Sequence, residues 1–175
     1  MSQVNRKKFN TRKLANLGLL IALQIVFSQF ISINTPIVKI GFGFLPLAIM
    51  GILYGHWTAG IGAVIADIIG LMIFPTGAYF PGFTLTEFLT GFVFGYFLHD
   101  KPKTWTRILI PVTIICIVLN LLLNTYWLTI MLGKGYLALL PTRAIKSIIM
   151  IPVQVITISL VWEKFILKIK HLAYS

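Results

Sequence analysis

Long apolar runs separated by short polar breaks are the dominant pattern of this 175-residue chain. A transmembrane helix needs about 20 largely apolar residues, and the segments that approach this length are roughly 14–33, 40–55, 57–74, 83–99, 107–132 and 138–166. The pattern predicts an all-α membrane protein with one integral membrane domain over residues 1–175. Within it we expect a basic N-terminal segment (1–13), six transmembrane helices (about 14–166) and a C-terminal segment (167–175).

The second and third segments leave an alternative open, because only Gly55, His56 and Trp57 separate them and one long helix over 40–74 would also fit. The distribution of Lys and Arg decides between the two topologies. Six spans with the N-terminus inside place eleven of the 15 basic residues on the cytoplasmic side, whereas five spans divide them almost equally. Cytoplasmic loops of membrane proteins carry an excess of Lys and Arg. We therefore predict six spans with both termini in the cytoplasm.

The composition supports a lipid environment: 58% of the residues are hydrophobic and 11% are charged, against about 25% charged in soluble domains. The net charge of +11 raises the possibility of nucleic-acid binding. The basic residues lie beside the apolar runs rather than along one exposed face, however, which is typical of topology signals. We expect the lipid bilayer, and no nucleic acid, as the surrounding partner.

Sequence motifs for catalysis are missing from the chain. It contains no G-x-x-x-x-G-K-[ST], no G-x-S-x-G and no H-E-x-x-H, and His56, His99 and His171 are widely separated. Cys116 is the single cysteine, so a disulfide or a thiolate metal site is excluded. We expect no catalytic residue, no metal and no cofactor, and any ATP hydrolysis must come from separate subunits.

Two acidic residues are candidates for ligand contact. Asp67 lies well inside the third span, where an acid costs about 2.5–3.5 kcal/mol on insertion scales and should face the bundle interior or a wet cavity. It either bonds a neighbouring helix or contacts a ligand. Glu87 lies early in the fourth span, after Thr84 and Thr86, where it either favours the helix dipole or contacts a ligand.

Four basic residues fall on the predicted outer side, where few acids balance them: Lys39, Lys134, Arg143 and Lys146. Snorkelling to the interface would account for any one of them. Together they predict an electropositive mouth of a pocket, suited to an anionic solute. Neutral hydrogen bonds there could come from Asn34, Asn120 and Asn124.

The outer loop over residues 74–83 holds two prolines, two glycines and four aromatic rings. Tyr79, Phe80 and Phe83 are candidates for stacking on a flat heterocycle and for closing over it. An aromatic belt at the membrane interface is the alternative interpretation.

Small residues recur four apart in several spans, as in Gly51 and Gly55 or Gly91 and Gly95. Close packing of helices within the bundle is the simplest interpretation. The first span is the exception, because Ala15, Gly18 and Ala22 form a smooth stripe suited to docking another membrane subunit.

Three stretches carry a resemblance to a known family: KIGFGFLPLAIMGILYGHWTAGIGAVIADIIG (39–70), FPTGAYFPGFTLTEFLTGFVFGYFLH (74–99) and GKGYLALLPTRAIKSIIMIPVQ (133–154). The chain resembles the substrate-binding S components of energy-coupling factor (ECF) vitamin transporters, in particular the folate-specific type. The resemblance implies a vitamin site under the outer loops after helices one, three and five. It also implies partners, namely a transmembrane T component and two ABC-type ATPase subunits. The family docks through an A-x-x-x-A stripe on the first helix, for which Ala15 with Gly18-x-x-x-Ala22 is the nearest match here.

Folate suits the candidate residues, because it joins a flat, donor-rich pterin to a glutamate tail with two carboxylates. We expect Asp67 or Glu87 at the pterin, with rings from the 74–83 loop stacking on it. Hydrogen bonding is expected from Asn124, and attraction of the tail from Lys39, Lys134, Arg143 and Lys146. Alternatives are an S component for another anionic vitamin or heterocycle, a stand-alone secondary carrier, or a membrane scaffold. A carrier should show charged relays across several helices or inverted repeats, and a scaffold would have no use for the basic and aromatic residues.

Overall fold

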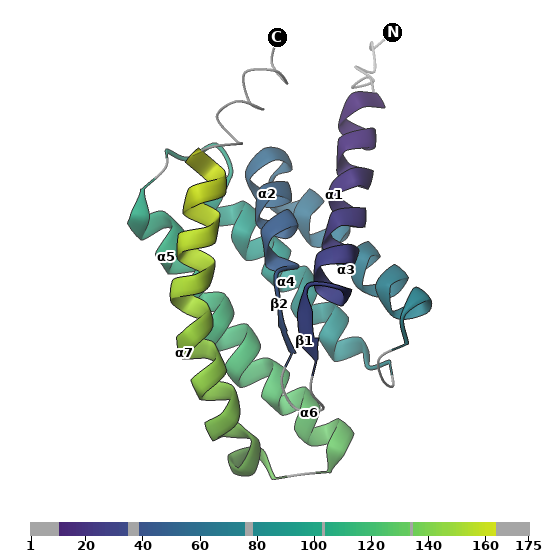
Figure 1. Ribbon diagram of the computed structural model, residues 1–175, viewed down its shortest axis with the longest axis vertical. Helices are drawn as coiled ribbons and strands as arrows, with labels where there is room; N and C mark the ends of the chain where they lie inside the picture. The colour runs from purple at the N-terminus through teal and green to yellow at the C-terminus, as the bar shows by residue number, and fades with distance from the viewer. Residues whose placement is uncertain (1–10, 35–38, 76–78, 103, 134, 164–175) are drawn as a thin grey trace, which may run out of the picture.

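The computed structural model describes residues 11–34, 39–75, 79–102, 104–133 and 135–163 (Figure 1). In chain order the elements are α1 (Thr11–Gln29), β1 (Ser32–Asn34), β2 (Lys39–Gly41), α2 (Phe44–Tyr54), α3 (His56–Ile73), α4 (Pro81–Leu98), α5 (Trp105–Ile114), η1 (Ile115–Leu123), α6 (Asn124–Leu132) and α7 (Tyr136–Val161). The π-helical segment η1 joins α5 and α6 into one continuous helix of 28 residues. The described chain therefore forms a six-helix bundle, as the hydrophobic pattern predicts.

Three of the described helices are long and apolar enough to cross a membrane by length and composition: α3, the α5–η1–α6 helix and α7. The 11 residues of α2 are apolar but cover only about 16 Å, roughly half of a hydrocarbon core. Most of α2 is buried inside the bundle, so its neighbours rather than lipid surround it.

The break between α2 and α3 lies at Gly55, whose φ of 83° falls in the left-handed region that favours glycine. The chain reverses direction there, so that α2 and α3 lie side by side. Met50 of α2 packs directly on Gly62 of α3. His99 follows the end of α4, and its Nδ1 lies 3.0 Å from the Ile52 carbonyl oxygen. The imidazole therefore caps the end of α2. The prediction of two helices in place of one long helix is confirmed.

Glycines bring α2, α3 and α4 into close contact. A Cβ at Gly91 of α4 would come within 2.5 Å of the Ala59 carbonyl oxygen, and a Cβ at Gly51 would lie 2.8 Å from the Gly95 nitrogen. These backbones therefore touch with no room for a side chain between them. Packing within the bundle accounts for this set of small residues.

A short hairpin between α1 and α2 differs from the prediction, which extended the first helix to residue 33 and began the second at 40. Ser32 pairs with Gly41 and Asn34 with Lys39. The helix ends early because the Ser32 hydroxyl donates to the Ser28 carbonyl over 2.7 Å, in place of a main-chain N–H. The strands then satisfy main-chain groups that a helix would otherwise pair internally.

The start of α1 and the end of α7 lie at the same end of the bundle (Figure 1). The α6–α7 connection lies at the opposite end, toward which the β1–β2 hairpin points. This arrangement divides the bundle into a half that holds the start of α1 and the end of α7 and a half that holds the hairpin.

Candidate binding site

A cavity of about 370 Å³ lies in the half of the bundle that holds the hairpin. Its walls come from the second half of α1, the start of α2, the second half of α3, the first half of α4, the η1–α6 region and α7. The volume is in the range of small-molecule sites. The cavity is lined by eight of the candidate residues that the sequence singles out: Asp67, Phe80, Phe83, Glu87, Asn120, Asn124, Arg143 and Lys146.

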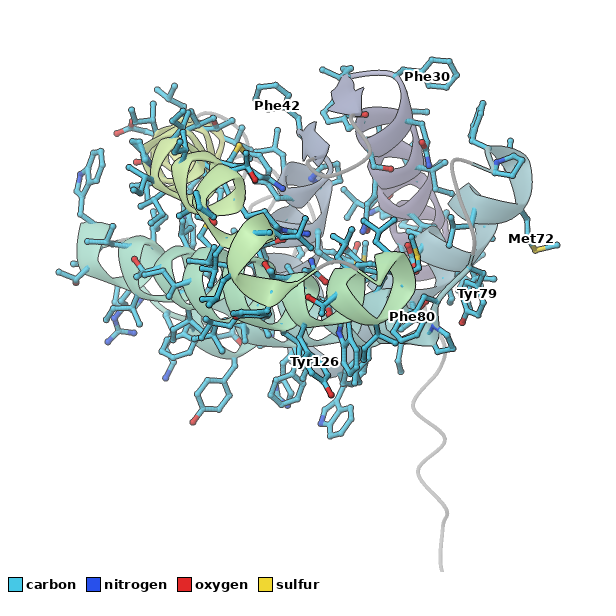
Figure 2. The ribbon with its side chains drawn as sticks, turned by 90° about the horizontal axis from the view of Figure 1, so that it is seen from below. Phe30, Phe42, Met72, Tyr79, Phe80 and Tyr126 are labelled. Carbon is cyan, nitrogen blue, oxygen red and sulfur yellow. The ribbon has the colours of Figure 1, made fainter. Side chains whose placement is uncertain are left out.

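The remaining candidates are Tyr79, Lys39, Lys134 and Asn34. Tyr79 is 57% exposed at the periphery of the bundle and is not part of the cavity lining (Figure 2). Lys134 and the side chains of Lys39 and Asn34 lie outside the described part of the chain, so their predicted roles stay predictions.

Arg143 is the most buried charged residue of the lining, with 5% of its surface exposed. Its Nη2 donates to the Asn120 carbonyl at 3.3 Å. Its Nε and Nη1 have no hydrogen-bond partner among the described residues. This position differs from the predicted pocket mouth and excludes snorkelling, because the guanidinium lies inside the bundle. Burying a guanidinium whose N–H donors have no acceptor costs free energy. An acceptor that binds those donors, best an anion, removes this cost.

The wall facing Arg143 is formed by η1, whose main-chain carbonyls accept hydrogen bonds from side chains of α7. In addition to the bond from Arg143, the Ser147 hydroxyl donates to the Cys116 carbonyl at 3.2 Å. The donor residues are four apart on α7, and the acceptor residues are four apart on η1. Two parallel bonds therefore fix the helices against each other beside the cavity.

Amide side chains continue this wall toward α6. Asn124 Nδ2 donates to Asn120 Oδ1 at 3.2 Å, and Asn120 Nδ2 donates to the Ile115 carbonyl at 3.2 Å. The other end of the chain of bonds, Asn124 Oδ1, is buried and unpartnered within the described structure. The two asparagines thus present a neutral acceptor next to the basic residues.

Asp67 bonds a neighbouring helix, which is one of the two roles that the sequence leaves open, and it also lines the cavity. Its Oδ2 accepts a 2.7 Å hydrogen bond from the Thr84 hydroxyl, which links α3 to α4. The same side chain lines the cavity. A carboxylate held in this way is fixed in orientation while it faces the space that a ligand would occupy.

Aromatic rings enter the cavity at the start of α4. Phe80 and Phe83 meet edge-to-face with ring centroids 5.9 Å apart, and Phe80 also contacts Trp127 at 5.5 Å. The Trp127 indole donates to the Thr86 hydroxyl at 3.2 Å, which fixes this cluster between α4 and α6. The cluster gives a flat ligand an aromatic surface on one side of the cavity.

Several lining residues were not singled out from the sequence: Gln24, Ser28, Gln29, Ser147 and Gln154. A signal was present, because polar residues inside apolar spans tend to face the bundle interior. Gln24 and Ser28 are four apart on the first span, and Ser147 lies four residues after Arg143 on the last. Each pair therefore shares a helix face.

The first-helix stripe lies apart from the cavity. Ala15, Gly18 and Ala22 are all exposed on α1, and no described atom outside α1 lies within 4 Å of where a Cβ on Gly18 would be. In contrast to the glycines of α4, this stripe is not used for packing by the described part of the bundle.

Comparisons with known proteins agree on one family. Residues 12–162 match the family described as "ECF transporter, substrate-specific component". The chain is 45% identical over 147 residues to the folate transporter FolT of Clostridium novyi (strain NT), which covers 84% of this chain and 86% of the relative. It is 33% identical over 155 residues to the folate transporter FolT of Leuconostoc mesenteroides subsp. mesenteroides, with 85% and 83% covered.

A solved structure gives the same result for the fold. The crystal structure of FolT bound with folic acid matches with a TM-score of 0.85 at 39% sequence identity. The match covers 89% of this chain and 95% of that structure. The six-helix arrangement is therefore shared along nearly the whole length of both chains.

Proposed function

Since the chain belongs to the family of substrate-specific components of ECF transporters, we propose that it captures folate in the described cavity for ATP-driven uptake. The observation that carries this proposal is the buried Arg143, which has donors without a partner among the described residues and lines one cavity with Phe80, Phe83 and Asp67. Folate supplies a matching anionic tail and a flat, donor-rich head. The two FolT relatives and the folic-acid-bound FolT structure support this choice of vitamin.

The tail of folate binds at the basic wall in this proposal. Arg143 and Lys146 lie on α7 three residues apart and both line the cavity, so their charges act on the same region. A carboxylate there accepts charge-assisted hydrogen bonds from the guanidinium nitrogens that have no partner among the described residues. Asn124 accepts a hydrogen bond from the amide that joins the tail to the aromatic part of the vitamin.

The pterin head binds between the aromatic cluster and the acidic residues. Phe80 and Phe83 stack on the ring, and Asp67 or Glu87 accepts its N–H donors. This placement uses the fixed orientation that Thr84 gives to Asp67.

Energy for uptake comes from other subunits. The family partnership implies a T component and two ABC-type ATPases, and the chain itself carries no nucleotide-binding motif. The uncovered stripe of Ala15, Gly18 and Ala22 is the surface we propose for docking the T component, because small residues let helices approach closely. No catalytic step is assigned to this chain.

In this proposal the protein is a multi-pass protein of the cell membrane, with both termini in the cytoplasm and the cavity toward the outer side. The positive charges flanking α1 and α5 support this orientation. Cysteines introduced one at a time at residue 3 and residue 133, in a chain whose native Cys116 is replaced by Ser, test it by labelling with an impermeant reagent. Residue 133 should react from outside intact cells and residue 3 only after lysis.

Folate binding is tested by titrating the purified protein in detergent and following tryptophan fluorescence. Trp127 contacts Phe80 of the cavity lining, so binding should change its emission. The absence of saturable binding at micromolar folate would refute the vitamin assignment.

Uptake into liposomes tests the energy source. Folate should accumulate only when the T component and the ATPases are reconstituted with this chain. Uptake by the chain alone under an ion gradient would instead identify a secondary carrier.

A further inference from the structure

Gln24 is a buried amide on a helix that otherwise exposes most of its surface. Only Leu20 and Gln24 are buried among the residues of α1, and the glutamine is 5% exposed. Its Oε1 has no hydrogen-bond partner in the described chain. Burying an amide oxygen without a hydrogen bond destabilises a folded protein, so a partner for the Gln24 oxygen would be favourable.

The position of Gln24 is fixed by its surroundings. The main chain of α1 at this level packs against Gly43 of the hairpin–α2 junction, where a Cβ would lie 3.5 Å from the Gln24 carbonyl oxygen and 3.0 Å from Ser28 Cβ. The Gln24 side chain lines the cavity together with Ser28 and Gln29. A ligand in the cavity is therefore a partner within reach of the Gln24 side chain.

Gln24 and Arg143 occupy different walls. Helix α1 packs against α2 and α3, whereas α7 packs against α5, η1 and α6, and the two helices lie on opposite sides of the bundle in Figure 1. The α1–α3 wall contributes the Gln24 amide and the Asp67 carboxylate, and the α7 wall contributes Arg143 and Lys146. The cavity is thus rich in acceptors on one side and cationic on the other.

We propose that Gln24 is a specificity-determining residue that binds the heterocyclic end of the substrate, opposite the carboxylates at Arg143. The 2-amino-4-oxo pyrimidine edge of a pterin carries an amide-like pair, a ring N–H beside a carbonyl. A glutamine amide complements that pair, since its oxygen accepts the ring N–H and its nitrogen donates to the carbonyl. A site built on such pairing rejects analogues that lack it, because its buried polar groups are then left unpaired.

This inference rests on the proposed function, and substrate fragments separate the two. Folate, unsubstituted pterin and N-(4-aminobenzoyl)glutamate are compared by fluorescence titration or by displacement of bound folate. The variant is Gln24→Met, which keeps the length and removes the amide. We expect a loss of about tenfold in affinity for folate and for pterin, with N-(4-aminobenzoyl)glutamate unaffected.

Two further variants control for indirect effects. Gln154→Met makes the same change at a buried lining residue of α7, whose Oε1 lies 3.8 Å from Cys116 Sγ, and it should not weaken pterin selectively. Gln24→Glu keeps an acceptor oxygen and should recover part of the pterin affinity.

The outcomes separate the two claims. Wild-type affinities in Gln24→Met, or an equal loss for both fragments, would overturn the role of Gln24 while folate binding stands. If the wild-type protein binds no folate, the proposed function fails and this assignment fails with it.

Discussion

Arg143 of α7 donates through Nη2 to the main-chain carbonyl of Asn120, 3.3 Å away in the π-helical segment. One nitrogen of the guanidinium thus fastens two helices, while Nε and Nη1 stay unpaired among the described residues beside the cavity. The same side chain therefore holds the wall together and offers charge to a ligand.

Replacing Arg143 with Ala should weaken binding of intact folate about 30-fold or more, because truncating one partner of a buried charged pair costs at least about 2 kcal/mol. Affinity for unsubstituted pterin should change much less, since that fragment carries no carboxylate. Titration of both ligands measures the difference. Equal losses would show that Arg143 acts only through the helix packing.

The two roles of Asp67 can be separated with a pair of variants. Thr84→Val removes the donor of the 2.7 Å hydrogen bond but leaves the carboxylate. We expect it to lower the free energy of unfolding by about 1–2 kcal/mol, measured by thermal unfolding in detergent. Folate affinity should change little.

Asp67→Asn keeps the shape and the acceptor oxygen but removes the charge. We expect it to reduce folate affinity more than Thr84→Val does, because N–H donors bind a carboxylate more strongly than an amide. If the loss of folate affinity in both variants is proportional to their loss of unfolding free energy, Asp67 serves the α3–α4 contact alone.

Leucine at two matched glycines should give opposite results. Gly91→Leu would clash with the Ala59 main chain, where even a Cβ comes within 2.5 Å of the carbonyl oxygen, so we expect misfolding and loss of folate binding. A Cβ at Gly18 would have no described atom beyond α1 within 4 Å, so folate binding by the isolated protein should persist in Gly18→Leu. Co-purification with the T component and ATPases should be lost for Gly18→Leu, and a fully assembled complex would refute the docking stripe.

Trp127 should report ligand binding more strongly than the other tryptophans. Its ring contacts Phe80 and its indole nitrogen is bonded to Thr86, whereas Trp57 and Trp105 are exposed on the outside of the bundle. Trp127→Phe should abolish most of the folate-induced fluorescence change. The matched variant Trp57→Phe should retain it, and the reverse result would place the ligand elsewhere.

The number of helices and the break at Gly55 could be predicted because they follow from hydropathy, charge and glycine chemistry, all of which are local. The β1–β2 hairpin could not, since each strand has only three residues and exists only through its pairing with the other strand. The π-helical geometry of η1 was equally hidden, because it is coupled to side chains of α7 that are distant in sequence.

Many of the residues that line the cavity could be named from the sequence, but Arg143 was expected at the pocket mouth and lies buried. Charge predicted an outer position, whereas the Asn120 carbonyl and the cavity accommodate the guanidinium inside the bundle. Gln24 was missed because a neutral residue in an apolar run gives a weak signal, and its importance depends on which helix face is buried.

The short length of α2 creates the space that the cavity occupies. The helix has 11 residues where its neighbour α3 has 18, a deficit of about two turns or roughly 10 Å. Gly43, Phe44 and Leu47, at or near the truncated end, line the cavity. Room for a ligand therefore comes from missing turns of backbone rather than from small side chains, and an insertion that lengthened α2 would fill the cavity with its own main chain.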